Sequence, residues 1–465
     1  MTTNITDTIL IITLMLAAIG FTIATKGAQF RFIREMVRQL FHSGRKEIGG
    51  TEDILINKKR SISSFQAFVV SVAARIGIGN LAGVAIAISV GGPGAVFWMW
   101  VMALLCSATA FIESTLAQLY KVKGNDSFLG GPCYYIMHGL HNRWWAITMA
   151  IITIFTLSYA GNAVQSQTLS NAFEVAFNIP TWLSGAIITA LLVAIIFGGI
   201  QSIAKFSQWA LPFMGIGYVL IAFVIVILNY QSIPHILSTI VNEAFGMHQA
   251  AGGSIGMAMI WGIKRGLFSN EAGEGSTPIV AATASVSHPV KQGLLQSLGV
   301  FTDTLIICTA TAIIILCHRS GLEGYSGIEL TQRAIDHHLG IPGLGQAFVS
   351  IAVLFFAFTS MLGYYYYGES CLRFLRSGKV WLTVFRITVA IVLFLGSVSS
   401  IDTVWQYVDI TMAIMTISNL IALSLLGKYA IRCLKDFQQQ RRAGKDPVYK
   451  ASTIPEIEND TPCWK

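Results

Sequence analysis

Charged residues are scarce in this chain: Asp, Glu, Lys and Arg make up 12% of its 465 residues, whereas hydrophobic residues make up 54%. Soluble domains carry about 25% charged residues. The length alone would suggest about three soluble domains, but long apolar runs recur along the whole chain and leave no stretch for a separate soluble domain. The composition therefore indicates one polytopic, all-helical bundle in a lipid bilayer.

Motifs for catalysis and for resident cofactors are also missing. The chain has no G-x-x-x-x-G-K-[ST] sequence, and Ser-x-x-Lys, H-E-x-x-H and G-x-S-x-G do not occur in a context that supports catalysis. The seven cysteines include no C-x-x-C pair, and the nine histidines are dispersed. We therefore expect no enzyme activity, no cofactor and no metal other than a transported cation.

The net charge of +8 comes from basic residues that cluster in particular loops, which is a topology signal and not a nucleic-acid surface. Eleven apolar segments approach the roughly 20 residues that a membrane crossing needs. They are residues 8–25, 65–90, 95–120, 146–169, 182–200, 209–229, 254–284, 293–317, 345–367, 381–398 and 404–426. The first lacks a preceding basic region, so we expect no cleaved signal peptide. Residues 30–41 form an amphipathic pattern that is typical of a helix on the cytoplasmic membrane surface.

The distribution of Lys and Arg places the amino terminus outside and the carboxyl terminus in the cytoplasm. Without the first span, the remaining ten divide into two fives that cross the membrane in opposite directions. We therefore expect an amino-terminal helix with a basic amphipathic segment at 1–62, one five-helix repeat at 63–230, a second at 252–426, and a cytoplasmic tail at 427–465.

Both fives begin with a helix that glycines interrupt. The first contains Gly77 and Gly79, and the second contains three glycines and two carboxylates, Glu271 and Glu274, between residues 266 and 278. An interrupted helix persists at membrane depth only where it is buried in protein or lines a polar cavity. Breaks at matching positions of two halves indicate the midplane site of a secondary transporter. For either segment alone, tight helix packing is the alternative explanation.

Broken helices expose backbone N–H groups at one end and carbonyl groups at the other, which suits a zwitterionic amino acid. We expect amides to bind its carboxylate and carbonyls to bind its ammonium group. The amides are those of Gly77, Ile78 and Gly79, and the carbonyls are those of Phe268, Ser269 and Asn270. Asn80 and Asn270 add neutral polar groups. Gln165 adds a third amide, for which an interhelical hydrogen bond is an alternative role.

Two adjacent hydroxyls, Thr359 and Ser360, lie within an apolar and aromatic span. Together with unwound backbone near Ala73 and Ile76 they would form an oxygen cage of the kind that suits an alkali cation. The alternative is that both hydroxyls bond carbonyls of their own helix.

Arg75 and Glu271 each lie at the break of their own half. We expect them to pair, because an isolated charge inside the membrane is costly. The pair would either lock one conformation of the two halves or hold the fold together.

Three sequence blocks resemble signatures of the alanine/glycine:cation symporter family, also called sodium:alanine symporters. These blocks are residues 74–100, 130–132 and 264–278. The resemblance implies a leucine-transporter-like fold with five-plus-five inverted repeats, one extra amino-terminal helix and eleven spans in the plasma membrane. It also implies sodium-driven uptake of alanine or glycine, with substrate between the first and sixth core helices and sodium between the first and eighth. Carried over by position, it implicates the substrate and cation residues named above.

Two residues depart from the family's pattern: Ile78 stands where Thr or Ser is frequent, and Glu274 where Met is frequent. A proton-coupled carrier or exchanger is the main alternative function. A channel is disfavoured because two breaks at one depth suit a single closed site, and a membrane-embedded enzyme lacks its motifs. Backbone groups bind the ammonium and carboxylate groups, which alanine, glycine, serine and the D-enantiomers have in common. The choice among these substrates therefore stays open.

Overall fold

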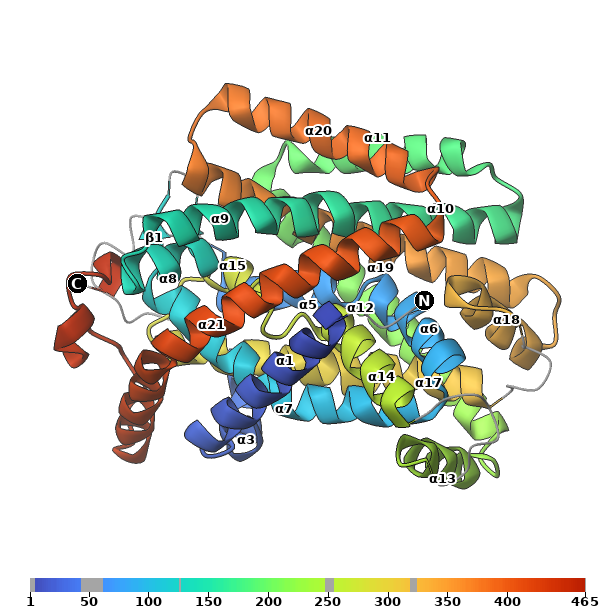
Figure 1. Cartoon of the computed structure of the whole chain (residues 1–465), viewed down its shortest axis with the longest axis horizontal. Helices are drawn as coiled ribbons and strands as arrows, with labels where there is room; N and C mark the ends of the chain where they lie inside the picture. Colours follow the sequence, from blue (N-terminus) through green and yellow to red (C-terminus); the bar gives the residue numbers. More distant parts are fainter. Residues whose placement is uncertain (1–4, 43–61, 125–126, 247–254, 318–323, 465) are drawn as a thin grey trace.

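The computed structural model describes residues 5–42, 62–124, 127–246, 255–317 and 324–464. Within these residues the chain is helical apart from turns, connecting segments and one antiparallel pair of short strands, β1 (Val122–Lys123) and β2 (Phe128–Leu129). Most of the long helices run roughly along the horizontal direction of Figure 1. Helices from both halves of the sequence therefore belong to one bundle.

Eight helices of the described residues are long and apolar enough to cross a membrane. They are Thr6–Ala24, Gly94–Leu119, Arg143–Phe177, Gly199–Leu228, Pro289–Leu316, Leu344–Leu375, Lys379–Ser397 and Ile401–Arg442. They belong to α1 (Ile5–Ala24), α7 (Gly94–Leu119), α9 to α10 (Arg143–Thr153 and Asn162–Phe177), α12 (Gly199–Leu228), α16 to α17 (Pro289–Val300 and Thr309–Leu316), α19 (Leu344–Leu375), α20 (Lys379–Ser397) and α21 (Ile401–Arg442). Two of these spans contain π-helical turns, η3 (Ile154–Gly161) and η4 (Phe301–Cys308).

The other three predicted spans are also helical but shorter or interrupted. The span at 65–90 is divided into α5 (Ser64–Arg75), η2 (Ile78–Asn80) and α6 (Ala82–Gly91), with a bend of 54° at the break. The span at 254–284 is divided into α14 (Ile255–Asn270) and α15 (Thr277–Ala281), and the span at 182–200 contains α11 (Thr181–Ile196). Each predicted apolar segment thus coincides with helix, while the count of eleven crossings stays a prediction.

The break between α14 and α15 has a backbone that ordinary helical residues do not adopt. Gly273 and Gly275 both have φ +94°, and Glu271 has φ +54°. Positive φ costs glycine little, whereas it is uncommon for a residue with a side chain. The glycine spacing noted in the sequence therefore sets where this helix stops.

Shorter helices cover the ends of the bundle. The predicted amphipathic segment forms α2 (Ala28–Arg31) and α3 (Ile33–His42), in which Met36 is buried while Phe41 is 75% exposed. α8 (Pro132–Gly139), α13 (Ile233–Ala244) and α18 (Gly327–Leu339) lie in connections between spans. The basic sequence Lys58-Lys59-Arg60, which helped to set the predicted topology, lies outside the described residues.

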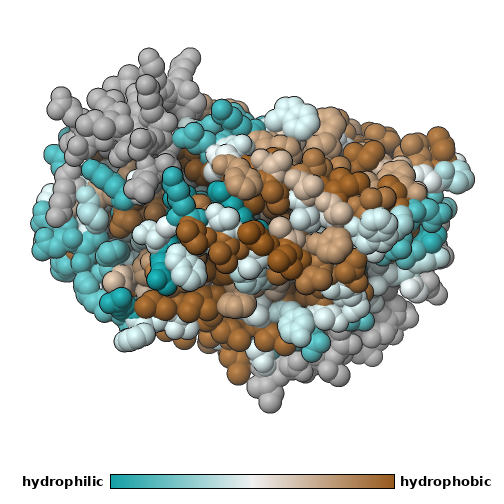
Figure 2. All heavy atoms as spheres, turned by 90° about the horizontal axis from the view of Figure 1, so that it is seen from above, coloured by the Kyte–Doolittle hydropathy of each residue, from teal (hydrophilic) through white to brown (hydrophobic). Residues whose placement is uncertain are grey.

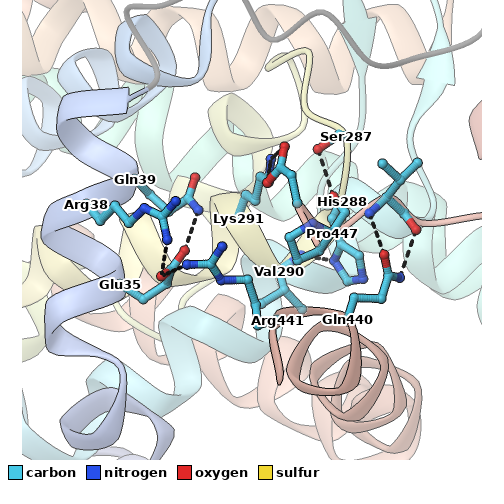
Figure 3. A network of polar contacts seen from close by, with 12 residues as sticks. Glu35, Arg38, Gln39, Ser287, His288, Val290, Lys291, Gln440, Arg441 and Pro447 are labelled. Atoms are coloured by element: carbon cyan, nitrogen blue, oxygen red, sulfur yellow. Dashed lines mark hydrogen bonds and ion pairs between the residues drawn. The ribbon is translucent and has the colours of Figure 1, made fainter. Parts of the chain in front are cut away.

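The carboxyl-terminal tail packs back on the bundle. α21 continues as helix to Arg442, beyond the predicted end of its span, and the segment after it returns toward the loop before α16. Tyr449 N donates to the carbonyl of Ser287 over 2.9 Å, and Ser287 Oγ donates to the carbonyl of Pro447 over 2.9 Å. Figure 3 shows the bond between Ser287 and Pro447, and it shows Arg441 reaching Glu35 on α3. The tail, the end of α21 and the surface helix α3 therefore form one polar cap.

The surface is divided into apolar and hydrophilic regions, as a protein in a bilayer requires. Figure 2 shows an apolar region across the middle of the molecule with hydrophilic residues at both ends. Only 22% of the apolar window of α12 and 28% of that of α20 is buried inside the protein. Apolar residues exposed to this extent are stable in lipid and not in water.

Candidate functional site

The two helix breaks meet at Gly79. A Cβ atom placed on Gly79 would lie 3.0 Å from Cδ1 of Phe268 and 3.2 Å from Cα of Ser269. Both contacts are tighter than ordinary van der Waals packing. Two segments almost 190 residues apart in the chain therefore touch, and glycine at this position permits the close approach.

Helices α10 and α19 close around the first break. Ile78 N donates to Oε1 of Gln165 on α10 over 3.3 Å, and Gly77 N donates to Oδ1 of Asn80 over 3.1 Å. A Cβ atom on Gly77 would lie 2.4 Å from Oγ of Ser360 on α19. The structure therefore brings together residues that the sequence analysis selected from three separate segments.

Asp303, in the π-helical turn η4, lies at the centre of this arrangement. Its Oδ1 accepts a hydrogen bond from Nδ2 of Asn80 over 2.7 Å, and its Oδ2 accepts one from Oγ of Ser269 over 2.7 Å. Thr304 Oγ1 donates to the same Oδ2 over 2.9 Å. One buried carboxylate thus joins the first break to the end of α14.

Asp303 lies within the predicted span at 293–317 and is absent from the predicted site. The signal was present, because an acidic residue inside an apolar span is usually functional. What the sequence could not supply was the direction of the side chain, which depends on the π-helical turn.

Asn270 ends α14 and forms part of the second break. Its Oδ1 accepts a hydrogen bond from Ala272 N over 3.0 Å, while its Nδ2 is buried without a hydrogen-bond partner. A buried donor without a partner costs about 1–3 kcal/mol. Asn270 can therefore offer a hydrogen bond inside the protein at a helix break.

The predicted ion pair between Arg75 and Glu271 is not formed. Arg75 Nε donates to Oγ1 of Thr277 over 3.1 Å, and Thr277 Oγ1 donates to Oε2 of Glu271 over 3.4 Å. Arg75 Nη1 donates to the carbonyl of Gln296 over 3.0 Å, and Ser276 Oγ donates to Oε2 of Glu271 over 2.7 Å. Neutral groups bond to both charges and Thr277 links them, while Nη2 of Arg75 and Oε1 of Glu271 are buried without a hydrogen-bond partner. The two breaks are therefore connected through a hydroxyl and not by direct contact of charges.

Glu113 on α7 supports the second break from its other side. Its Oε1 accepts from Gly273 N over 3.1 Å, and its Oε2 accepts from Nδ2 of Asn419 on α21 over 3.2 Å. Asn419 Nδ2 also donates to the carbonyl of Gly273 over 2.9 Å. This pair holds an irregular backbone in place by supplying the partners that a helix would have supplied. Glu113 lies within the predicted span at 95–120, and its position in the sequence alone did not indicate this role.

Glu274, the other carboxylate of the second break, is also buried, and its Oε1 has no hydrogen-bond partner. Within the described residues, no group of three or more His, Cys, Asp or Glu side chains has the arrangement of a metal site. Amides and hydroxyls of the protein thus hold Glu113 and Glu271, whereas Oε1 of Glu274 is left without a partner.

The predicted cation residues also meet. Thr359 Oγ1 lies 2.9 Å from the carbonyl oxygen of Ala73, and Ser360 Oγ lies 2.6 Å from that of Ala74. Thr359 Oγ1 also lies 3.0 Å from the carbonyl of Phe355 on its own helix, as the alternative explanation predicted. Ile76 is the residue at which α5 ends, beside these oxygens in sequence. Hydroxyls of α19 and carbonyls at the end of α5 therefore form one oxygen-rich cluster.

A group of charges and aromatic rings covers the site on the side of the amino-terminal end of α14. Arg265 Nη2 lies 2.5 Å from Oδ2 of Asp409, and the guanidinium carbon of Arg265 lies 4.3 Å from the ring centroid of Trp405. Trp405 in turn packs against Phe268, with ring centroids 4.9 Å apart and the ring planes tilted by 50°. Lys264 Nζ lies 3.0 Å from Asp409, so two cations share this carboxylate. These contacts tie α14 to α21 directly above the meeting point of the breaks.

Comparison with known proteins gives the same architecture. Solved structures of a manganese transporter from Eremococcus coleocola match 90% of this chain and 88% of that one, with a TM-score of 0.51 at 12% identity. Mhp1, a nucleobase-cation-symport-1 family transporter, matches with a TM-score of 0.50 at 15% identity, over 83% of this chain and 80% of that one. At these identities the likeness concerns the fold alone. The protein has the leucine-transporter-like fold that its broken helices indicate.

Relatives at higher identity define the family. The chain is 45% identical to the probable sodium/glutamine symporter GlnT of Bacillus subtilis, over 98% of this chain and 93% of the relative. It is 38% identical to the sodium/alanine symporter AgcS of Methanococcus maripaludis, over 82% of this chain and 85% of the relative. A sequence model of the sodium:alanine symporter family matches residues 1–451. The chain is therefore a multi-pass membrane protein that belongs to the sodium:alanine symporter family.

Proposed function

We propose that this protein couples the inward movement of sodium to the uptake of a small neutral amino acid, alanine or glycine, by alternating access. The observation that carries the proposal is the contact of the two broken helices at Gly79, Phe268 and Ser269, surrounded by buried polar groups. Family membership adds support, since relatives are named as sodium/alanine symporters.

The substrate would lie between the breaks. Its carboxylate would accept hydrogen bonds from the backbone of Gly77, Ile78 and Gly79, and Nδ2 of Asn270 is a buried donor that would gain a partner. Gln165 and Asn80 now accept from two of these amides and would yield them to the substrate.

The ammonium group would lie near the carbonyls that end α14 at Phe268, Ser269 and Asn270. The carboxyl end of a helix carries partial negative charge. Asp303, bonded to Ser269, would add a full negative charge at the same place. Phe268 packs on Trp405 and on Gly79, which favours a small side chain.

Sodium would bind where the hydroxyls of Thr359 and Ser360 face carbonyls of the first break, at Ala73 and toward Ile76. Moving one positive charge through about 100 mV is worth about 2.3 kcal/mol, which is enough for roughly a fiftyfold substrate gradient. The site would thereby connect α5 and α19, one helix from each of the repeats that we propose at 63–230 and 252–426. Coupling requires that sodium bind the two conformations with different affinity.

The cluster of Arg265, Asp409 and Trp405 would close the extracellular side in the conformation described here. With the amino terminus outside and the carboxyl terminus in the cytoplasm, these residues lie on the outer side of the breaks. Opening would separate α14 from α21 and break the contact between Arg265 and Asp409.

Glutamine is a second candidate substrate, because the 45% identical relative is named a probable sodium/glutamine symporter. Glutamine shares the ammonium and carboxylate groups and differs in the volume that must fit beside Phe268. Competition of labelled alanine uptake by glycine, alanine, serine and glutamine would rank them.

The test is uptake of labelled alanine by the purified protein in proteoliposomes, with sodium, potassium and proton gradients imposed separately. We expect saturable uptake that an inward sodium gradient alone drives. Uptake that ignores sodium and follows an inward proton gradient would replace the proposal by a proton-coupled carrier. Flux that does not saturate would indicate a channel.

A further inference from the structure

A cavity of about 730 Å³ lies away from the helix breaks, where α11 meets α12 and where α19 is followed by α20. Its wall contains four basic side chains and one acidic side chain. The basic residues are Arg373, Arg376, Lys379 and Arg386, and the acidic residue is Glu369. The transport site described above uses none of these residues.

The side chains that line this cavity, which we call the basic pocket, carry a net positive charge. Arg373 makes two hydrogen bonds to Oε1 of Glu369, over 3.0 and 2.8 Å, so the acidic residue is matched by one arginine. The three other cations remain, and among the residues that the structure describes no further carboxylate lines the cavity. Arg376 lies over the ring of Trp381 at 4.5 Å, which orients its guanidinium group. The pocket therefore attracts a ligand with negative charge.

The surroundings of the basic pocket are apolar and face outward. Phe197 is 63% exposed, Val380 is 74% exposed and Trp381 is 43% exposed. Phe197 and Val380 lie at the ends of α11 and α20, whose exposed residues belong to the apolar surface. Arg386 lies over the ring of Phe197 at 4.7 Å, so basic and apolar groups adjoin. A ligand that fits both surroundings has an anionic head and apolar chains.

We propose that this pocket binds the phosphate headgroup of an anionic phospholipid, with Arg376, Lys379 and Arg386 as its partners. Basic pockets between transmembrane helices on the cytoplasmic side bind such headgroups. The loop between α19 and α20 is rich in Lys and Arg and is therefore expected on that side. A guanidinium group can hold a phosphate by two parallel hydrogen bonds. The acyl chains would lie along the exposed residues of α20 and the end of α11.

The test is a lipid titration of the purified full chain, followed by native mass spectrometry, with phosphatidylglycerol, cardiolipin and phosphatidylcholine. We expect the two anionic lipids to bind more tightly than phosphatidylcholine. Each basic residue near a phosphate contributes about a fivefold change in affinity. The double variant Arg376→Gln with Lys379→Gln should therefore bind phosphatidylglycerol about thirtyfold more weakly. Both residues are exposed, so the fold should be retained.

A matched control is Lys428→Gln with Lys435→Gln on α21, which removes the same charge from exposed positions outside the pocket. We expect it to bind phosphatidylglycerol as the unchanged protein does, and the charge-preserving variant Arg376→Lys with Lys379→Arg to stay within about threefold. Equal weakening by the control variant, or equal affinity for phosphatidylcholine, would overturn the proposal. Displacement of phosphatidylglycerol by millimolar inorganic phosphate would also overturn it, in favour of a soluble anion.

Discussion

Replacing Asp303 with asparagine should strongly impair transport, because this carboxylate joins the two breaks. Its oxygens accept hydrogen bonds from Asn80, Ser269 and Thr304, at 2.7, 2.7 and 2.9 Å. Asparagine has nearly the same volume but only one acceptor oxygen, and its NH₂ group faces donors on the other side. Either orientation of the amide loses at least one of these hydrogen bonds and the charge that strengthens the others.

The magnitude follows from the value of a hydrogen bond to a charged group, about 1.5–3 kcal/mol. Loss of one such bond from the arrangement that binds substrate should lower kcat/KM by between about tenfold and about 150-fold. The assay is the initial rate of sodium-driven alanine uptake in proteoliposomes, with the rate divided by the amount of folded protein. Asp402→Asn removes the same charge at an exposed position in the first turn of α21 and serves as the control. Uptake by Asp303→Asn within twofold of the control would refute this reasoning.

Three further predictions concern other parts of the molecule. Ser360→Ala removes a hydroxyl that lies 2.6 Å from a carbonyl of the first break. The sodium concentration that gives half-maximal uptake should therefore rise about fivefold to tenfold. An unchanged sodium concentration would show that Ser360 is not part of the cation site. Gly79→Ala places a Cβ atom 3.0 Å from the ring of Phe268 and should abolish uptake. Gly83→Ala places a Cβ atom 3.9 Å from its nearest neighbour and should leave uptake unchanged. Equal uptake by the two variants would contradict the close approach of the two breaks at Gly79. Burial lowers the pKa of His288 below 6.5 although Asp436 lies 3.1 Å away, so the unfolded chain binds a proton that the folded protein excludes. The free energy of unfolding should therefore fall as the pH falls below about 6.5. In His288→Gln the unfolding temperature should depend less on pH in this range. Identical pH dependence of the unfolding temperature in the two proteins would show that His288 does not contribute.

The general architecture could be predicted from the sequence because lipid imposes simple requirements on it. Apolar runs of about 20 residues must be helices, and all the predicted segments coincide with helix. Glycines at 77 and 79 and between 266 and 278 marked both breaks, since few other residues tolerate such backbone and such close approach. Family resemblance supplied the order of the core helices and agreed with the fold of the solved structures.

The contacts between the two halves were harder to predict, because they depend on where side chains point after the helices pack. The hypothesis of a direct Arg75–Glu271 pair was reasonable by charge and position. In the structure Thr277 lies between the two groups and bonds to each of them. Asp303 and Glu113 were visible as charges in apolar spans, yet Asn80 and Gly273, which bond to them, lie more than 100 residues away. Spacing along one chain carries no information about such distant partners.

The polar cap could not be predicted for a related reason. The carboxyl-terminal segment is polar, and its sequence is typical of a solvated tail, but Tyr449 and Pro447 bond to the loop before α16. Figure 3 shows the bond at Pro447. These are bonds between backbone groups or from a serine hydroxyl to a carbonyl. Backbone groups occur at every residue, so no pattern of side chains announces them.

The central claim is that substrate and sodium bind together at the contact of the two broken helices. The most direct measurement is the affinity of the purified protein for alanine as a function of sodium concentration, together with the affinity for sodium as a function of alanine. We predict that each ligand raises the affinity for the other by the same factor, and that Ser360→Ala reduces this factor. An alanine affinity that is the same with sodium and with potassium would show that the two ligands do not bind together at this contact.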